Sequence, residues 1–477
     1  MNSLSLNATP EGWSVARIGE VCDVNPRANK TEIPDDLLVS FVPMPAVGAG
    51  DGSIDVSQER RASEVKKGFT AFKEGDVLFA KITPCMENGK MAVVPKVANG
   101  HGFGSTEFHV LRPKEGVEAR YIYYYVSSQN FRGVAERYMT GAVGQKRVST
   151  TYLKEQEIPL APLNQQKRIV AEIEKQFSRL DEAVANLKRV KANLKRYKAA
   201  VLKAAVEGKL TEEWRKQNPD VEPADKLLER ILEERRAKWE EAELAKMKAK
   251  GKVPKNDKWK GKYKEPVAPD TDGLPELPEG WVWVRVDVIA EVMLGKMLDR
   301  KKHQEGKELP YLRNVNVRWG AVDTGDLLQM FFKDSELVRY GIRAGDVLVC
   351  EGGEPGRAAI WDGKQSGMMY QKALHRVRFL DGYDPLLIVF YLEHLAKSGR
   401  LERWFTGSTI KHFTRESFAG LPLLLPPRDE QVAIVEEVEK SLSIISETAE
   451  QIDKDLRRAE RLRQSILKKA FQGGFNR

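Results

Sequence analysis

The chain has 477 residues, a length that allows two to four domains, and it contains no apolar run long enough to cross a bilayer. Its formal net charge of +9 suits a partner rich in phosphate, although basic proteins with other functions are common. The first ten residues lack the pattern of an export signal, and the three cysteines follow no metal or disulfide spacing. We therefore expect a cytoplasmic protein with no membrane partner, whose cysteines are small core residues.

Residues 1–161 are predicted to form a first globular domain of mixed helices and strands. Strand-like runs stand at 76–80 and 91–94, and a helix is expected over 119–128. Polar and basic side chains gather in the turns, after the first run and in a Thr-Gly loop at Thr140. Such side chains can bind base edges or phosphate, with a solvated loop as the alternative for any single residue. The DNA-binding candidates of this domain are Lys81, Asn88, Lys90, Gln145, Lys146 and Arg147.

Residues 162–210 are predicted to form a long helix. Its apolar residues alternate four and three positions apart from Ile173 to Ala205, which is the spacing of a coiled-coil seam. Asn164, just after a proline, is a candidate N-cap, and Gly208 is a candidate C-cap. A helix of on the order of 40 residues is about 60 Å long.

A highly charged tract, residues 211–276, comes next. A helical run from Leu227 to Lys250 is followed by several prolines, which predicts an exposed helix and then a semi-extended linker. The sequence indicates no chemistry for this tract.

The second half of the chain repeats the order of the first. The shared motifs are Glu-Gly-Trp at 11–13 and 279–281, Gly-Asp-Val-Leu at 75–78 and 345–348, and Thr-Gly at 140–141 and 406–407. Residues 277–425 are therefore predicted to form a second domain, with a strand at 346–350 and a helix over 386–398, and residues 426–477 a second long helix from Asp429 to near Gly473. Its DNA-binding candidates are Arg357, Lys411, His412 and Arg415.

The repeat favours two domains of one fold that serve two different targets, because the segments between the shared motifs agree far less than the motifs do. An old duplication without functional meaning is the alternative. Both long helices are acidic in their first half and basic in their second. Antiparallel pairing sets opposite charges side by side, so we expect an antiparallel coiled coil within the chain, with a pseudo-twofold axis. Packing of both apolar stripes on the globular domains is the alternative.

No catalytic constellation is found. The chain has no phosphate-binding Gly-x-x-x-x-Gly-Lys loop, and Asn25-Pro26-Arg27 lacks the second proline and the aromatic residue of an amino-methyltransferase motif. The glycines at 352, 353 and 356 predict a tight turn, and the six histidines show no metal spacing. We therefore expect no cofactor and no enzymatic activity.

These motifs resemble one known family, the specificity subunits of type I restriction–modification systems. The resemblance covers nearly the whole chain and is most specific at the start of each long helix. There a proline is followed by a glutamine four residues later and by an isoleucine three residues after that. These residues are Pro162, Gln166 and Ile169 in the first copy and Pro427, Gln431 and Ile434 in the second. Gln165 stands where the second copy has Glu430, a difference that we do not expect to matter.

The resemblance implies an α+β chain with two target-recognition domains, each of which reads half of a bipartite, asymmetric site in double-stranded DNA. It also implies that the helical regions bind two methyltransferase subunits, which bring S-adenosylmethionine, and that motor–nuclease subunits complete the restriction complex. We assign the partner contacts to Gln166, Ile169, Gln431 and Ile434. Two other classes of function are a structural adaptor that holds two copies of a protein partner and a nuclease with a hidden carboxylate site.

Overall fold

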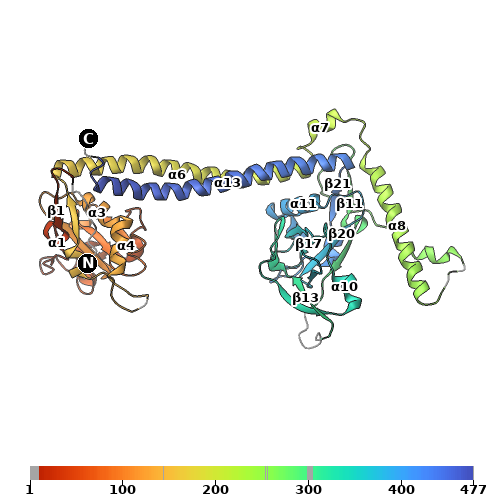
Figure 1. Ribbon diagram of the computed structural model, residues 1–477, viewed down its shortest axis with the longest axis horizontal. Coiled ribbons are helices and arrows are strands. Elements are labelled where there is room, and N and C mark those ends of the chain that lie inside the picture. The colour runs from red at the N-terminus through yellow and green to blue at the C-terminus, as the bar shows by residue number, and fades with distance from the viewer. Residues whose placement is uncertain (1–9, 143, 253, 255, 298–304, 476–477) are drawn as a thin grey trace. The chain divides into compact units, whose positions relative to one another are not determined.

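The computed structural model describes residues 10–475 except 143, 253, 255 and 298–304. The chain divides into two compact units, unit 1 with residues 1–190 and 451–477 and unit 2 with residues 191–450. Two helices of 44 residues each, α6 (Leu163–Val206) and α13 (Arg428–Phe471), run from one unit into the other (Figure 1). No helix in the described part of the chain is long and apolar enough to span a membrane.

Unit 1 contains the first globular domain, which is built on a four-stranded sheet of order β2-β9-β6-β7. The central strand β6 is buried on both faces: Val77 and Phe79 belong to the core beneath helix α3 (Ala119–Ser127), and Leu78 and Ala80 to the core beneath a second sheet of order β4-β3-β8-β5. The strands of the first sheet are β2 (Cys22–Val24), β9 (Phe108–Pro113), β6 (Val77–Ala80) and β7 (Met91–Val93). Those of the second are β4 (Glu59–Arg61), β3 (Leu38–Val42), β8 (Gly102–Gly104) and β5 (Thr70–Phe72).

The ends of this domain are tied together by a two-stranded antiparallel pair, β1 (Ser14–Arg17) with β10 (Glu157–Leu160). The helices of the domain are α1 (Ile18–Val21), α2 (Ala62–Val65), α3 (Ala119–Ser127), α4 (Gln129–Arg137) and α5 (Thr150–Glu155).

Unit 2 contains the second globular domain, which repeats this plan. Its main sheet has the order β12-β20-β17-β18, and its ends are tied by β11 (Val282–Arg285) and β21 (Pro422–Leu425). The main-sheet strands are β12 (Ala290–Leu294), β20 (Leu374–Phe379), β17 (Val347–Cys350) and β18 (Ala358–Ile360). The helices are α9 (Val286–Ile289), α10 (Asp334–Tyr340), α11 (Pro385–Lys397) and α12 (Arg415–Ala419).

The two domains differ in the layer that covers the main sheet. The second domain has a three-stranded sheet and a short hairpin there, although both domains keep one parallel pair, β3–β8 in the first and β13–β19 in the second. The three-stranded sheet is β16 (Leu328–Phe332), β13 (Lys307–Leu312) and β19 (Met369–Tyr370), and the hairpin is β14 (Val317–Arg318) with β15 (Ala321–Val322). The internal repeat is thus confirmed, and its divergence lies mainly in this covering layer.

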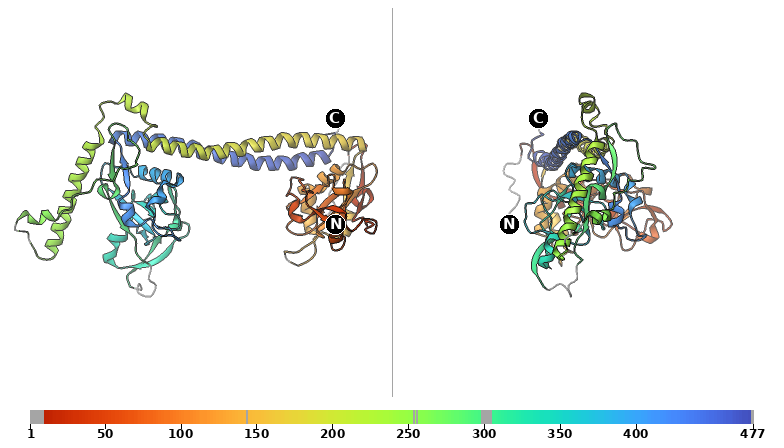
Figure 2. Two further views of the ribbon diagram at one scale, coloured as in Figure 1. Left: turned by 180° about the vertical axis from the view of Figure 1, so that it is seen from behind. Right: turned by 90° about the vertical axis from the view of Figure 1, so that its right-hand side faces the viewer.

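The long helices pair within each unit, and the direction of pairing follows from which residues meet. In unit 1, Arg463 of α13 forms an ion pair with Asp181 of α6 at 2.6 Å and lies 4.1 Å from the ring centroid of Phe177. In unit 2, late residues of α6 share a core with early residues of α13, among them Leu202 and Ile434. Early α6 therefore meets late α13, and late α6 meets early α13, so the predicted antiparallel pairing is confirmed; Figure 2 shows the helices side by side from behind.

The ends of the long helices confirm one prediction and correct another. Gly208 and Gly473 follow the helices with φ values of +66° and +81°, the left-handed conformation that glycine adopts readily at a C-cap. The N-cap prediction is wrong, because α6 begins at Leu163 and α13 at Arg428, which places Asn164 and Asp429 inside the first turn. The preceding prolines take the cap position: the Pro162 carbonyl accepts from the backbone N–H of Gln166 at 2.9 Å.

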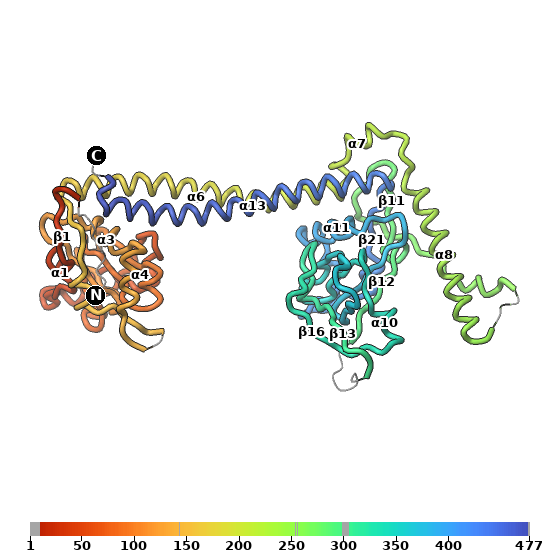
Figure 3. The backbone as a smooth tube through the Cα atoms, in the orientation of Figure 1, coloured from red at the N-terminus to blue at the C-terminus, as the bar shows by residue number. Residues whose placement is uncertain are grey.

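The charged tract between the domains begins with α7 (Glu212–Gln217) and continues with α8 (Ala224–Ala249), which confirms the helix predicted there. A 3₁₀ helix, Asp257–Lys262, follows α8. Figure 3 shows α8 continuing past the body of the second domain before the chain turns back.

Candidate nucleic-acid interface

In the first domain, the structure brings the two predicted loops together. The loop after β6 and the Thr-Gly loop are joined by backbone hydrogen bonds, from Thr83 N to Lys146 O at 3.0 Å and from Val148 N to Lys81 O at 2.9 Å. A third segment joins them, because Gly50 N donates to Gly89 O at 3.1 Å. Loop segments that lie more than sixty residues apart in sequence are therefore neighbours in the fold.

The second domain builds the same arrangement. The Thr-Gly loop closes on itself through paired backbone bonds between Thr406 and His412, at 2.8 and 2.9 Å, and Phe413 N donates to Glu351 O at 2.8 Å. The loop after β17 thus lies against the loop that carries Lys411 and His412, as its counterpart does in the first domain.

In each domain a buried histidine forms a hydrogen bond with a backbone carbonyl at the end of the Thr-Gly loop. Neither histidine was predicted from the sequence. His109 Nε2 lies 2.8 Å from the Val148 carbonyl oxygen, and His375 Nε2 lies 2.7 Å from that of Phe413. Burial lowers the pKa of His109 and lowers that of His375 from 6.5 to about 4, so both rings are neutral near pH 7 and their Nε2–H groups donate. The sequence does carry a sign of this pair, because in both repeats a histidine stands three residues before an arginine, His109 before Arg112 and His375 before Arg378.

Those two arginines form a second repeated contact. Arg112 makes a two-pronged ion pair with Asp76, and Arg378 makes the same pair with Asp346; in both copies the aspartate belongs to the Gly-Asp-Val-Leu motif. The nitrogen–oxygen distances are 2.8 Å in the first domain and 2.7 Å in the second. Each aspartate also accepts from a backbone N–H three residues before it, which fixes the turn that leads into the central strand.

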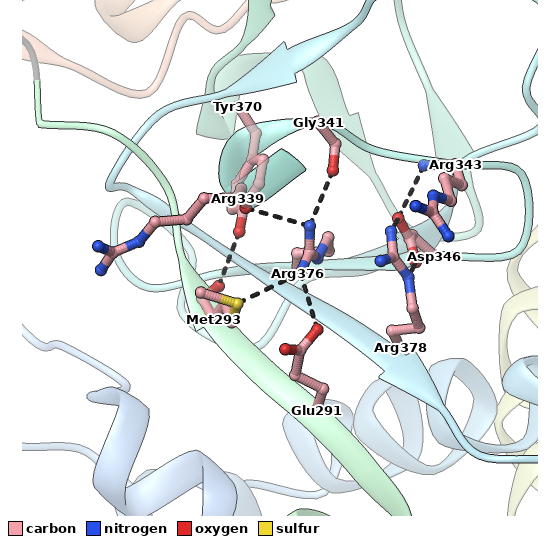
Figure 4. Close-up of polar contacts among 9 residues, drawn as sticks. All are labelled: Glu291, Met293, Arg339, Gly341, Arg343, Asp346, Tyr370, Arg376 and Arg378. Atoms are coloured by element: carbon pink, nitrogen blue, oxygen red, sulfur yellow. Dashed lines mark hydrogen bonds and ion pairs between the residues drawn. The ribbon is translucent and has the colours of Figure 1, made fainter. Parts of the chain in front are cut away.

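One buried arginine belongs to the second domain alone (Figure 4). Arg376 is 1% exposed and takes the place that Val110 has in the first domain. It donates to the carbonyls of Arg339 and Gly341 at 3.1 and 2.8 Å and pairs with Glu291 at 2.8 Å. Arg376 therefore fastens the end of α10 to the main sheet, which fits the different covering layer of this domain.

Six of the predicted DNA-binding side chains are exposed: Asn88, Gln145, Lys146, Lys411, His412 and Arg415. Arg415 also pairs with the neighbouring Glu416 at 3.1 Å, an exposed contact. Lys81, of the first domain, is half-buried. These side chains can offer amide, imidazole and cationic donors to bases or phosphates, two chemically different sets on two similar loops.

The other three predicted DNA-binding side chains are held by their own domain. Arg147 makes a two-pronged ion pair with Glu107 at 2.9 and 2.8 Å, and the hydrogen bonds from Arg147 lower the pKa of Glu107. Lys90 donates to two backbone carbonyls, at 3.2 and 2.9 Å. Arg357 pairs with Glu354 at 2.7 Å and donates to Asn314 O at 2.8 Å, so only 13% of its side chain is exposed.

The four residues assigned to partner contacts are each 1% exposed in this structure. Gln166 accepts from Glu118 N at 2.8 Å and donates to Ala161 O at 2.7 Å, and Gln431 accepts from Asp384 N at 2.8 Å. Ile169 and Ile434 lie in the domain cores. These side chains fasten each long helix to its own domain, and the prediction that they contact a partner stays a prediction.

The difference between Gln165 and Glu430 does matter, contrary to our expectation. Each accepts a hydrogen bond from the indole of the Glu-Gly-Trp motif: Trp13 Nε1 to Gln165 Oε1 at 2.9 Å, and Trp281 Nε1 to Glu430 Oε2 at 2.8 Å. Glu430 is completely buried and also accepts from Thr211 at 2.6 Å and pairs with Arg215 of α7. The carboxylate at this position therefore anchors the start of the charged tract.

The described residues offer little for metal or thiol chemistry. No group of three or more His, Cys, Asp or Glu side chains among them is placed to hold a metal ion. Burial raises the pKa of Cys22 to about 12 and that of Cys350 to about 11, which leaves both thiols protonated and unreactive near pH 7.

Comparison with known proteins gives a consistent result. The family model for the type I restriction modification DNA specificity domain matches the chain twice, over residues 10–196 and 278–457. The specificity subunit of the Escherichia coli type I restriction enzyme EcoAI is 30% identical over an alignment of 366 residues that covers 67% of this chain and 58% of that protein. The EcoEI specificity subunit, also from Escherichia coli, is 26% identical over an alignment of 490 residues that covers 90% of this chain and 77% of the relative.

Two solved structures share the fold. One chain comes from a structure described as the basis of complex assembly and conformational transition of the type I R-M system; it has a TM-score of 0.67 at 20% identity and covers 98% of this chain and 99% of its own. The HsdS subunit from Thermoanaerobacter tengcongensis has a TM-score of 0.60 at 19% identity, with 99% of this chain and 100% of the other covered.

Proposed function

The chain belongs to the type I restriction modification DNA specificity family, and we propose on this basis that each of its globular domains reads one half of a bipartite, asymmetric DNA sequence. The observation that carries the proposal is the repeated pair of loops. Both domains hold a Thr-Gly loop against the loop after the central strand, over a buried neutral histidine, yet the exposed side chains on the two loops differ. Two domains that recognise different base sequences need side chains of different hydrogen-bonding chemistry at equivalent positions.

The exposed loop residues are the proposed readers. In the first domain these are Asn88, Gln145 and Lys146, together with the half-buried Lys81, and in the second Lys411, His412 and Arg415. Lys90, Arg147 and Arg357 are proposed to position the loops, because their donors are already engaged by the protein.

The proposed partners are two methyltransferase subunits, which bind the helical regions and supply S-adenosylmethionine, and the motor–nuclease subunits of the complete restriction complex. The chain itself contributes recognition in the cytoplasm, with no catalytic step and no cofactor of its own. The antiparallel helices set the length of the unread spacer between the half-sites.

The first experiment is methylation mapping. The chain is co-expressed with the methyltransferase encoded beside it, and host DNA is sequenced for methyladenine. We expect one bipartite motif, modified once on each strand and lost when the chain is omitted. An absence of modification, together with no co-purification of the two proteins, would favour the adaptor, and cleavage of DNA by the purified chain with magnesium would favour a nuclease.

The second experiment tests the readers with two matched variants, Lys146→Gln and Lys411→Gln. Each removes one exposed charge from an equivalent loop, and each is assayed on duplexes in which one half-site or the other has been changed. We expect Lys146→Gln to relax discrimination at one half-site and Lys411→Gln at the other, each by about 1–3 kcal/mol. Equal loss at both half-sites would mean that these lysines bind phosphate and do not read bases.

A further inference from the structure

The charged tract carries a surface that the recognition domains do not account for. Residues 246–264, the end of α8 and the turn after it, contain nine lysines and one acidic residue. The preceding part of α8, residues 224–245, contains seven acidic and five basic residues. The positive charge is therefore concentrated at the far end of this arm, which we call the lysine tip.

The start of α8 is packed against the second domain, and the turn after α8 is packed against the helix itself. Leu227 and Ile231 of α8 are buried in the core of the second domain, where Leu227 lies against Gly382. At the other end, the rings of Trp239 and Trp259 stack at 6.0 Å and Tyr263 lies 5.3 Å from Trp239, so the turn after α8 is clasped back onto the helix. Lys260 strengthens the clasp through an ion pair with Glu240 at 3.1 Å.

Most of the lysine tip has no charge partner of its own. Lys246 pairs with Glu243 and Lys260 with Glu240, but six others have no carboxylate partner within the described part of the chain. These six are exposed, namely Lys248, Lys250, Lys252, Lys258, Lys262 and Lys264. Two lysines in the last turn of a helix are explained by the helix dipole, but lysines after the helix end are not.

We propose that the lysine tip is a second, sequence-independent contact with the phosphate backbone of duplex DNA. The inference rests on the proposed function, in that the chain must bind DNA. Exposed lysines on flexible stems suit phosphate, since each presents a point charge that needs no fixed geometry. A protein partner would need apolar anchors, but both aromatic rings of the tip, Trp259 and Tyr263, are used in the clasp with Trp239.

The test compares two triple variants of the full chain that lose the same charge. The tip variant is Lys252→Gln, Lys258→Gln and Lys264→Gln, all outside α8. The control variant is Lys209→Gln, Lys216→Gln and Lys226→Gln, exposed lysines that are already paired with glutamates. Binding to a target duplex and to a random-sequence duplex is followed by fluorescence anisotropy between about 50 and 200 mM salt.

We expect the tip variant to bind both duplexes at least about tenfold more weakly at low salt, with the slope of log affinity against log salt reduced by about 2 to 3. The control variant should keep the slope of the unmodified chain. Equal slopes in the two variants would overturn the proposal, and so would unchanged DNA binding combined with loss of a co-purified protein subunit. The ratio of target to random affinity reports on the proposed function instead, and the tip variant should leave it unchanged.

Discussion

Glu430 offers the sharpest test of how the charged tract is held. Replacing it with glutamine keeps the shape of the side chain and removes the charge. In the first domain, Gln165 already shows how a glutamine satisfies the indole of this motif, with its oxygen toward Trp13. A glutamine at 430 that does the same for Trp281 must turn its amide nitrogen, a donor, toward Arg215, which is a donor as well, and toward the Thr211 hydroxyl, which would have to reverse its role and accept.

The energetic effect follows from these contacts. A hydrogen bond to a charged group contributes about 1.5–3 kcal/mol; the bond from Arg215 is lost, and the bond with Thr211 becomes an ordinary bond between neutral groups. Arg215 is 22% exposed and regains some hydration when its partner is removed, so we expect the anchored state to lose about 2 to 3 kcal/mol. That loss makes local opening of α7 roughly 30- to 140-fold more frequent.

Hydrogen–deuterium exchange of the backbone amides in residues 209–217 measures this opening directly. The matched control is Gln165→Glu, which makes the reciprocal exchange at the equivalent position of the first domain and should leave α7 unchanged. The exchange of β17 amides serves as an internal reference for global stability. If α7 in the Glu430→Gln variant exchanges at the rate of the unmodified chain, the carboxylate does not anchor the tract and the reasoning is wrong.

Three further predictions concern the buried His375, the contact of Gln431 that fastens α13 to its domain, and the spacer between the half-sites. His375 must stay neutral in the folded domain, and its pKa is about 4 there against 6.5 in the unfolded chain, so stability falls as the pH drops from 6.5 toward 4. Between about pH 7.5 and pH 5 the second domain should lose ~2 kcal/mol, measured by hydrogen exchange in β20, and a His375→Gln variant should lose less over the same range. Gln431→Leu leaves the Asp384 N–H and two carbonyls without partners, so urea unfolding of the second domain should show a loss of about 2–4 kcal/mol, whereas exchange in the first domain stays unchanged. Deleting one heptad from both α6 and α13 shortens each helix by about 10 Å, and methylation mapping should then find a shorter spacer in the recognised motif; an unchanged spacer would sink the idea that the helices set it.

Much of the architecture could be predicted because periodicity, charge and repetition are properties of the linear sequence. The alternation of apolar residues from Ile173 to Ala205 gave the long helix, and the acid-to-base order along both helices gave the direction of pairing. The Gly-Asp-Val-Leu motif marked the central strand in both domains, and the structure adds that its aspartates, Asp76 and Asp346, fix the turn before that strand.

The engagement of individual side chains could not be predicted, because it depends on residues distant in sequence. Whether Arg147 is free to bind DNA is decided by Glu107, forty residues earlier. The same limit explains Glu430, whose partner Arg215 lies in the charged tract between the two repeats, which is not itself part of the repeat. An alignment of the two halves therefore compares Glu430 with Gln165 and hides the reason why they differ.

The pairing of β1 with β10, and of β11 with β21, has a consequence for how such chains change. In each domain the strand that enters and the strand that leaves lie against each other, with Ser14 opposite Leu160 and Val282 opposite Leu425. The chain therefore enters and leaves each domain at the same place, where its first and last strands pair. Replacing the segment between the two paired strands would therefore exchange both sheets of a domain at once and leave the strands that close it unchanged.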